Sequence, residues 1–461
     1  MRKIGFFFGL CVCCFVATHA ATVTGPISGG ERGTPFSAVD VSEMGYVTEE
    51  FFVEGIANAY RLKEGTHSPD GKWSSERSDT TAPFKTRMLV VRPIESDRFN
   101  GTVIVFWLNV TAGFELGSAA GEALRGYAWV GVSAQKVGVD GFPQDPQGLK
   151  AWDPVRYGSL VHPGDAYSYS IFTQVARALS PDRDQSVLDP MGGLAVERLI
   201  AVGASQSAMR LRTYINGVHH VENVFDGYIP FIDFGRVFPF AREMSGERRG
   251  GNRSAIRDDL DVPTIVVNSE TEVPSYYGVR EDDTDRFRYW EVAGTSHVSV
   301  PRPEEQTSGA NWLAYTPVYN AAIRHLHVWI KDDVAPPKMP RIKVNPAAQM
   351  PEVVRDIHGN AVGGIRLPDL EVPSAAHTGF GTPQEGTRFG FLYGRAEDFD
   401  QEKLSTLYPD GETYLIAWNT ALNRSVEQGM VLAEDASAMR EQASRWAARL
   451  DAAATQVSGG E

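Results

Sequence analysis

A tight turn of small residues between an apolar run and a helix-compatible stretch is the feature that most constrains this fold. Residues 199–202 (Leu-Ile-Ala-Val) predict a short buried strand, and residues 208–214 favour a helix. Between them, residues 203–207 read Gly-Ala-Ser-Gln-Ser. A strand, a small-x-Ser-x-small turn and a helix are typical of a nucleophile elbow, although Gly is usual where this chain has Ser207. The pattern predicts that Ser205 lies at the end of a strand in an α/β sheet.

Other apolar runs alternate with helical patterns on both sides of this turn. The predicted strands are 102–108, 127–132, 198–202, 224–229, 264–267 and 287–292, and the predicted helices are 117–125, 165–179, 206–216 and 317–331. Alternating buried strands and helices indicate a mostly parallel central sheet flanked by helices, with right-handed crossovers. Asp165 is a plausible N-cap for one of these helices.

The region before this alternating pattern predicts a different kind of pairing. Residues 45–55 and 86–93 read as strands, and the polar stretch 63–82 between them reads as turns. We expect these two strands to form an antiparallel edge of the sheet.

The chain of 461 residues is long enough for one large domain or two ordinary ones, and its tail is too irregular to be an obvious independent domain. We expect a single domain over 21–461, with a core at about 86–335 and a C-terminal extension at about 338–461 that ends in a helix over 433–453.

The glycine- and arginine-rich segment 233–261 lies between two core strands, where such folds insert caps. Its arginines are Arg236, Arg242, Arg248, Arg249 and Arg253. They predict a preference for substrates that carry an anionic group.

The first twenty residues read as a secretory signal peptide. Arg2 and Lys3 precede an apolar stretch over 4–16 that is too short to span a bilayer, and cleavage is expected after Ala20, with Ala21 as the alternative. We therefore expect export to the periplasm or the medium, with no stable membrane anchor. All three cysteines lie in this leader, which excludes disulfides, a cysteine nucleophile and thiolate metal sites from the mature chain.

The net charge of −14 argues against nucleic acid or an anionic membrane as a partner. The sequence carries no dinucleotide-binding fingerprint, Walker motif or zinc-ligand cluster, so we expect no cofactor and no metal.

A serine hydroxyl needs a base within hydrogen-bond reach, and the base needs an orienting acid. In hydrolases built on such a sheet the chain order is serine, acid, histidine. His297 is the predicted base because it follows the strand 287–292 through a short loop of small residues.

The acid is expected after the strand 264–267. The small residue that ends this strand is commonly followed three positions later by the acid, and counting from Ser269 gives Glu272. Glu270 is the first alternative, and Asp233, after the preceding strand, is the second.

Two backbone N–H groups are expected to form the oxyanion hole. One belongs to Gln206, at the start of the elbow helix. The other belongs to the loop after the strand 102–108, where we favour Val110. Asn109 contributes its side-chain amide, fixes the loop or caps a turn.

Several longer phrases of the chain resemble a known family. They are WLNVTAG (107–113), GYAWVGVSAQKVGV (126–139), GASQSAMRLRTYING (203–217), NVFDGYIPF (223–231), NSETE (268–272), DTDRFRYWEVAGTSH (283–297) and HGNAVGGIRLPDLEVP (358–373). The chain thereby resembles the secreted bacterial "alpha/beta hydrolase domain" family of the α/β-hydrolase superfamily. The resemblance covers almost the whole mature chain and implies an α/β-hydrolase fold. It also implies Ser205 as nucleophile, His297 as base and an acid within 268–272, but it implies no substrate.

These observations together predict a secreted serine hydrolase that cleaves a small-molecule or polymeric carboxylic ester through an acyl-enzyme. The alternatives on the same triad are an amidase, a polyester depolymerase and an acyltransferase. An alternative of another class is a non-catalytic hydrolase-fold binding protein.

Overall fold

The computed structural model describes residues 21–33, 39–63, 65, 67–183, 188–243, 251–302, 309–347, 350–381 and 389–458, with side chains up to residue 452. Within these residues, nine strands form one sheet in the order β1-β2-β3-β5-β4-β6-β7-β8-β9. Two further pairs, β10 with β11 and β12 with β13, lie in the C-terminal part. The predicted signal peptide, residues 1–20, lies outside the described residues.

The strands of the large sheet are β1 (Thr22–Thr24), β2 (Tyr46–Leu62), β3 (Ser75–Pro93), β4 (Thr102–Trp107), β5 (Ala128–Val132), β6 (Arg198–Ala204), β7 (Gly227–Phe231), β8 (Thr264–Ser269) and β9 (Phe287–Val292). The short strands are β10 (Val344–Asn345), β11 (Glu352–Val353), β12 (Ala375–Thr378) and β13 (Arg395–Asp398). The α-helices are α1 (Lys136–Asp140), α2 (Leu149–Trp152), α3 (Pro154–Tyr157), α4 (Ser168–Leu179), α5 (Gln206–Gly217), α6 (His219–Glu222), α7 (Val273–Tyr276), α8 (Thr316–Asp332), α9 (Pro368–Glu371), α10 (Gln401–Leu407), α11 (Gly411–Glu427) and α12 (Ala433–Ser458).

The direction of the strands divides the sheet into two parts. From β5 through β4, β6, β7 and β8 to β9, all neighbouring strands are parallel. The strands β1, β2 and β3 are antiparallel, and β3 joins the parallel part through an antiparallel pairing with β5. The mostly parallel sheet and its antiparallel edge are therefore both confirmed.

The two faces of the sheet are covered by different helices, because successive side chains of a strand point to opposite faces. Val103 and Val105 of β4 lie in the same apolar cluster as α4 and α5. Ile104 and Phe106 of the same strand lie in the cluster that contains α8, α11 and α12. The parallel strands are buried on both sides, as their continuous apolar runs predict.

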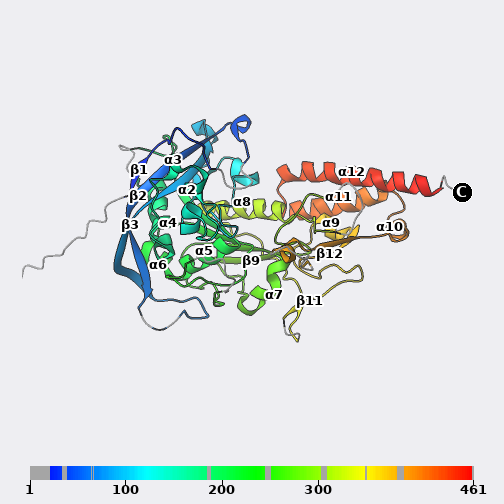
Figure 1. Ribbon diagram of the computed structural model, residues 1–461. Helices are drawn as coiled ribbons and strands as arrows, with labels where there is room; N and C mark the ends of the chain where they lie inside the picture. Colours follow the sequence, from blue (N-terminus) through cyan, green and yellow to red (C-terminus); the bar gives the residue numbers. More distant parts are fainter. Residues whose placement is uncertain are drawn as a thin grey trace, which may run out of the picture.

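The C-terminal extension packs into the same core as the sheet. Trp418 of α11 and Trp446 of α12 share an apolar cluster with Val202 of β6 and Trp290 of β9. In Figure 1 these helices lie at the opposite end of the molecule from β1, β2 and β3. The sequence predicted a helix over 433–453, which α12 confirms, but α10 and α11 were not predicted.

Three local expectations were wrong. The stretch 63–82 is not all turn, because β2 runs to Leu62 and β3 begins at Ser75. The predicted helix 117–125 is only a 3-10 turn over Gly121–Leu124. Asp165 is not the N-cap of α4, which begins at Ser168; its carboxylate pairs with Arg210 and accepts from the N–H of Lys136 (2.9 Å), at the start of α1.

The segment 233–261 connects β7 to β8 without a helix among its described residues. Its two ends are fixed to the elbow helix α5, because Arg212 donates to Asp233 (2.8 Å) and to the carbonyl of Ser254 (2.7 Å). Arg248 and Arg249 lie outside the described residues.

Candidate active site

The backbone reverses at Ser205, between β6 and α5. Ser205 has φ 58° and ψ −115°, a conformation that costs a non-glycine residue about 1 to 3 kcal/mol. Its N–H donates to the carbonyl of Phe231 (2.9 Å), which continues the pairing of β6 with β7 into the turn. Strained serines on sharp strand-to-helix turns are typical of nucleophile elbows, which hold the hydroxyl clear of the sheet.

The small neighbours of Ser205 are explained by contacts inside the turn. A Cβ at Gly203 would lie 2.6 Å from the carbonyl oxygen of Ser207, so no larger residue fits there without a shift. The Ser207 hydroxyl accepts from the N–H of Ala204 (2.9 Å) and lies 3.0 Å from the Ala204 carbonyl, to which it donates. The Ser207 hydroxyl therefore closes the turn by hydrogen bonding to the backbone N–H and carbonyl of Ala204. A glycine at position 207 could not make these two hydrogen bonds.

His297 and Glu272 are brought together by the loops after β9 and β8. His297 Nδ1 lies 2.6 Å from Glu272 Oε1, and the two side chains are almost completely buried. A carboxylate only accepts hydrogen bonds, so Nδ1 carries the hydrogen and Nε2 is left as the acceptor. This is the tautomer that a general base for a serine requires.

The spacing of three residues that predicted Glu272 has a local cause. Ser269 and Glu272 form a capping box at the start of the 3-10 helix Glu270–Glu272. Glu272 Oε2 accepts from the backbone N–H of Ser269 (2.9 Å) and from its hydroxyl (2.5 Å). One carboxylate oxygen is thus fixed by the helix start, and the other is free to orient His297.

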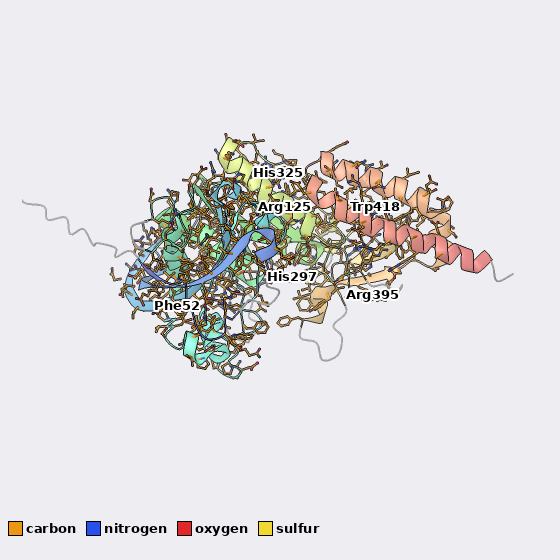
Figure 2. The ribbon with its side chains drawn as sticks, turned by 90° about the horizontal axis from the view of Figure 1, so that it is seen from above. Phe52, Arg125, His297, His325, Arg395 and Trp418 are labelled. Carbon is orange, nitrogen blue, oxygen red and sulfur yellow. The ribbon has the colours of Figure 1, made fainter. Side chains whose placement is uncertain are left out.

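The loop after β7 lies between the elbow and the histidine. The ring of Phe234 stacks on the imidazole of His297 at a centroid distance of 5.2 Å, and Phe231, three residues earlier, accepts the Ser205 N–H. Since β6, β7, β8 and β9 are parallel neighbours, Ser205, Glu272 and His297 all lie at the carboxyl edge of the sheet. In the view of Figure 2, His297 lies between Phe52 on one side and Trp418 and Arg395 of the extension on the other.

The backbone of His297 is also fixed by a hydrogen bond to its carbonyl. The hydroxyl of Tyr315 donates to the carbonyl of His297 (3.0 Å). Burial, and then the nearby Glu272 carboxylate, raise the pKa of Tyr315, so this hydroxyl keeps its proton.

The two alternative acids contact other groups. Asp233 pairs with Arg212 (2.8 Å), and burial raises the pKa of this carboxyl although Arg212 opposes the effect. Glu270 accepts from the N–H groups of Gly294 (3.0 Å) and Gly379 (2.9 Å). Of the three candidate carboxylates, only that of Glu272 has a hydrogen bond to His297 among the described contacts.

The loop after β4 contacts the start of α5 directly. The N–H of Val110 lies 3.5 Å from Gln206 Oε1. Asn109 donates to the carbonyl of Ala204 (2.9 Å) and accepts from the N–H of Thr111 (2.8 Å), so its side chain ties the loop to the elbow. The roles of Val110 and Gln206 in an oxyanion hole stay predictions, and the side chain of Asn109 fixes the loop.

A buried polar network behind Gln206 was missed by sequence reasoning. The amides of Gln206 and Gln135 hydrogen bond reciprocally (2.7 and 3.1 Å). Gln135 also accepts from Arg210 (3.2 Å), which pairs with Asp165 (2.8 Å). The one local signal is the spacing of four between Gln206 and Arg210, which places both side chains on the same face of α5.

Among the described residues, no group of three or more histidine, cysteine, aspartate or glutamate side chains is arranged to hold a metal ion. In the same part of the chain, no helix has the length and apolar character needed to cross a bilayer.

A family model described as an alpha/beta hydrolase domain matches residues 23–441. No curated protein matches the chain. Similar solved structures include the esterase Est1E from Butyrivibrio proteoclasticus, with 10% identity, a TM-score of 0.30 and coverage of 54% of this chain and 96% of that one. A putative dienelactone hydrolase from Klebsiella pneumoniae has 13% identity, a TM-score of 0.26 and coverage of 52% and 85%. A structure of fungal esterases from Rhizomucor miehei has 13% identity, a TM-score of 0.29 and coverage of 61% and 86%.

Proposed function

Because this chain belongs to the alpha/beta hydrolase domain family, we propose that it is a serine esterase that cleaves carboxylic esters through Ser205, His297 and Glu272. The observation that carries the proposal is the 2.6 Å hydrogen bond between His297 Nδ1 and Glu272 Oε1, at the same sheet edge as the strained turn at Ser205. This combination is what nucleophilic catalysis by serine requires.

The first half of the reaction forms an acyl-enzyme. Ser205 Oγ attacks the ester carbonyl while His297 Nε2 takes the hydroxyl proton, and Glu272 stabilises the resulting imidazolium. The backbone N–H groups of Gln206 and Val110 donate to the oxyanion of the tetrahedral intermediate. The C–O bond to the alcohol then breaks, and the imidazolium returns its proton to the leaving alkoxide.

The second half releases the acid. Water attacks the acyl-enzyme carbonyl and gives its proton to His297 Nε2. The bond to Ser205 Oγ breaks, the serine recovers the proton, and the carboxylic acid leaves. An amine leaving group, a polymeric ester or an acceptor alcohol in place of water would make the same site an amidase, a polyester depolymerase or an acyltransferase.

We also propose that the protein is exported to the periplasm or the medium. The support is the basic and then apolar composition of residues 2–16, followed by small residues up to Ala20. Sequencing the N-terminus of protein recovered from the periplasm tests this proposal. A mature start at residue 21, or at residue 22 if cleavage follows Ala21, is expected, and an intact leader on the folded protein would contradict the proposal.

The esterase proposal is tested with p-nitrophenyl esters of increasing acyl length, from acetate to palmitate. The wild type is expected to hydrolyse at least one of them, and Ser205→Ala is expected to lower kcat by about 10⁴-fold or more. Hydrolysis that Ser205→Ala leaves intact would overturn the serine mechanism. A folded wild type that cleaves no ester, anilide or polyester would favour a binding protein on a hydrolase fold.

A further inference from the structure

A second buried carboxylate lies beside the proposed triad and has no part in the chemistry. Glu270 is 0% exposed. Its Oε2 accepts from the N–H of Gly294, in the loop that leads to His297 (3.0 Å). Its Oε1 accepts from the N–H of Gly379 (2.9 Å) and from Nη2 of Arg355, both in the C-terminal extension. Glu270 therefore joins the histidine loop to the extension.

Thr271 makes a second link between the histidine loop and the C-terminal extension. Its hydroxyl donates to the carbonyl of Gly379 and accepts from the backbone N–H of His297 (2.9 Å). A Cβ at Gly379 would lie 2.7 Å from the Thr271 nitrogen and 2.8 Å from Glu270 Cβ. Only a glycine allows the extension to approach this closely, so the contact is built into the backbone.

Arg355 supplies the charge that this arrangement needs. A buried carboxylate is costly unless a cation and hydrogen-bond donors compensate it. Arg355 is the one cationic side chain within ion-pair distance of Glu270 among the described residues, and it is itself held by the His377 carbonyl (3.1 Å). We propose that Arg355 is a positioning residue for His297, acting through the Glu270 carboxylate, so that the C-terminal extension completes the active site. The proposal rests on the proposed esterase function.

The charges around His297 predict in which direction the pH profile of the enzyme moves when one of them is removed. Among the described residues, the ionisable groups that contact His297 or its loop are Glu272, Tyr315 and Glu270, and Glu270 is paired with Arg355. The pair of Glu270 and Arg355 is neutral overall. Removing the cation leaves a negative charge that favours the protonated imidazole, whereas removing the anion leaves a positive charge that disfavours it.

The test uses the full chain and the pH profile of kcat/KM on a p-nitrophenyl ester. In Arg355→Met, the acid limb of the profile is expected to move to higher pH by about half a unit or more. In Glu270→Gln, it is expected to move to lower pH. The double variant, neutral at both positions, is expected to return close to the wild-type profile, and Arg355→Lys to stay near it.

If the contact between Glu270 and Arg355 were purely structural, both single variants would lose thermal stability and activity together. The acid limbs of their pH profiles would then not move in opposite directions. Acid limbs that coincide in the wild type and both single variants would overturn the proposal. If Arg355→Met is insoluble, the displacement in Glu270→Gln decides alone. Arg395→Met is the matched control, because it removes an exposed ion pair with Glu397 in the same extension. A wild type without esterase activity would instead refute the proposed function, which this series therefore tests separately.

Discussion

At the scale of single residues, the three candidate acids differ in what each carboxylate touches. Glu272 has one oxygen in a capping box and the other on His297. Asp233 is the buried partner of Arg212, and Glu270 is the partner of Arg355. Of these three buried carboxylates near strand ends, one therefore contacts the histidine and the other two are paired with arginines.

This assignment predicts opposite phenotypes for two isosteric substitutions. Glu272→Gln is expected to lower kcat by about 10³- to 10⁴-fold with little loss of stability, because the geometry survives but the imidazolium loses its partner. Asp233→Asn is expected to destabilise the fold by about 1 to 3 kcal/mol, because it removes one of the two carboxylates paired with the buried Arg212 guanidinium and leaves only Glu281 (3.1 Å). Steady-state kinetics and urea denaturation check both. A large catalytic loss in Asp233→Asn without loss of stability would contradict the assignment.

The local part of the site could be predicted from the sequence because its signals are short. The small residues around Ser205, the spacing from Ser269 to Glu272 and the loop before His297 each lie within a few positions of a strand end. Gln135 and Arg355 could not be predicted, because their partners are 71 and 85 residues away along the chain.

At the scale of elements, the segment 233–261 carries two arginines that face one another. Arg236 and Arg253 are partners in an isolated antiparallel bridge, and neither forms an ion pair within the described residues. Burial, and then the charge of Arg253, lower the pKa of Arg236. An anion bound between them would relieve this repulsion. The expected preference for anionic substrates therefore becomes a proposal about Arg236 and Arg253.

The proposal predicts a change in selectivity. In the double variant Arg236→Gln/Arg253→Gln, the ratio of kcat/KM for p-nitrophenyl hemisuccinate to that for p-nitrophenyl butyrate is expected to fall roughly tenfold, the effect of one lost charge-assisted hydrogen bond. Arg257→Gln is the control, since Arg257 is already paired with Asp259. An unchanged ratio in the double variant would remove these arginines from substrate recognition.

Secondary structure could be predicted where the pattern of apolar residues was clear. The apolar runs that became β4 and β5 are buried on both faces, so their apolar pattern is continuous. The segment 63–82 was mistaken for turns because the first half of β3 is polar and mostly half-buried or exposed, and it is held in the sheet by pairing with β2. Hydrogen bonds to a neighbouring strand cannot be predicted from the local amino-acid composition.

At the scale of the whole molecule, the extension and the sheet share one core, and buried histidines lie along their boundary. His377 of β12 hydrogen bonds through Nδ1 to Asn311 Oδ1 (3.0 Å), and Asn311 donates to the carbonyl of Gly294 (2.6 Å) in the histidine loop. Burial, and then the charge of Arg302, lower the pKa of His377 to about 3.

This burial predicts a stability that depends on pH. The unfolded chain binds a proton at His377 below about pH 6.5, whereas the folded chain does not until far lower pH, so stability from this residue is present above pH 6.5 and is lost as the pH falls. Between pH 7.5 and 5.5 the wild type is expected to lose about 1.4 kcal/mol more than His377→Gln does. Urea denaturation of both proteins at both pH values measures this difference. Equal losses would mean that His377 is protonated in the folded protein.

Covalent labelling shows whether Ser205 is the activated nucleophile that the proposed mechanism needs. The full-length protein is incubated with a fluorophosphonate, and the adduct is located by mass spectrometry of the peptides. One phosphonyl group is expected on Ser205 in the wild type, no adduct in Ser205→Ala, and much slower labelling in Glu272→Gln. A folded wild type that stays unlabelled, or equal labelling of Ser205→Ala, would contradict the proposed mechanism.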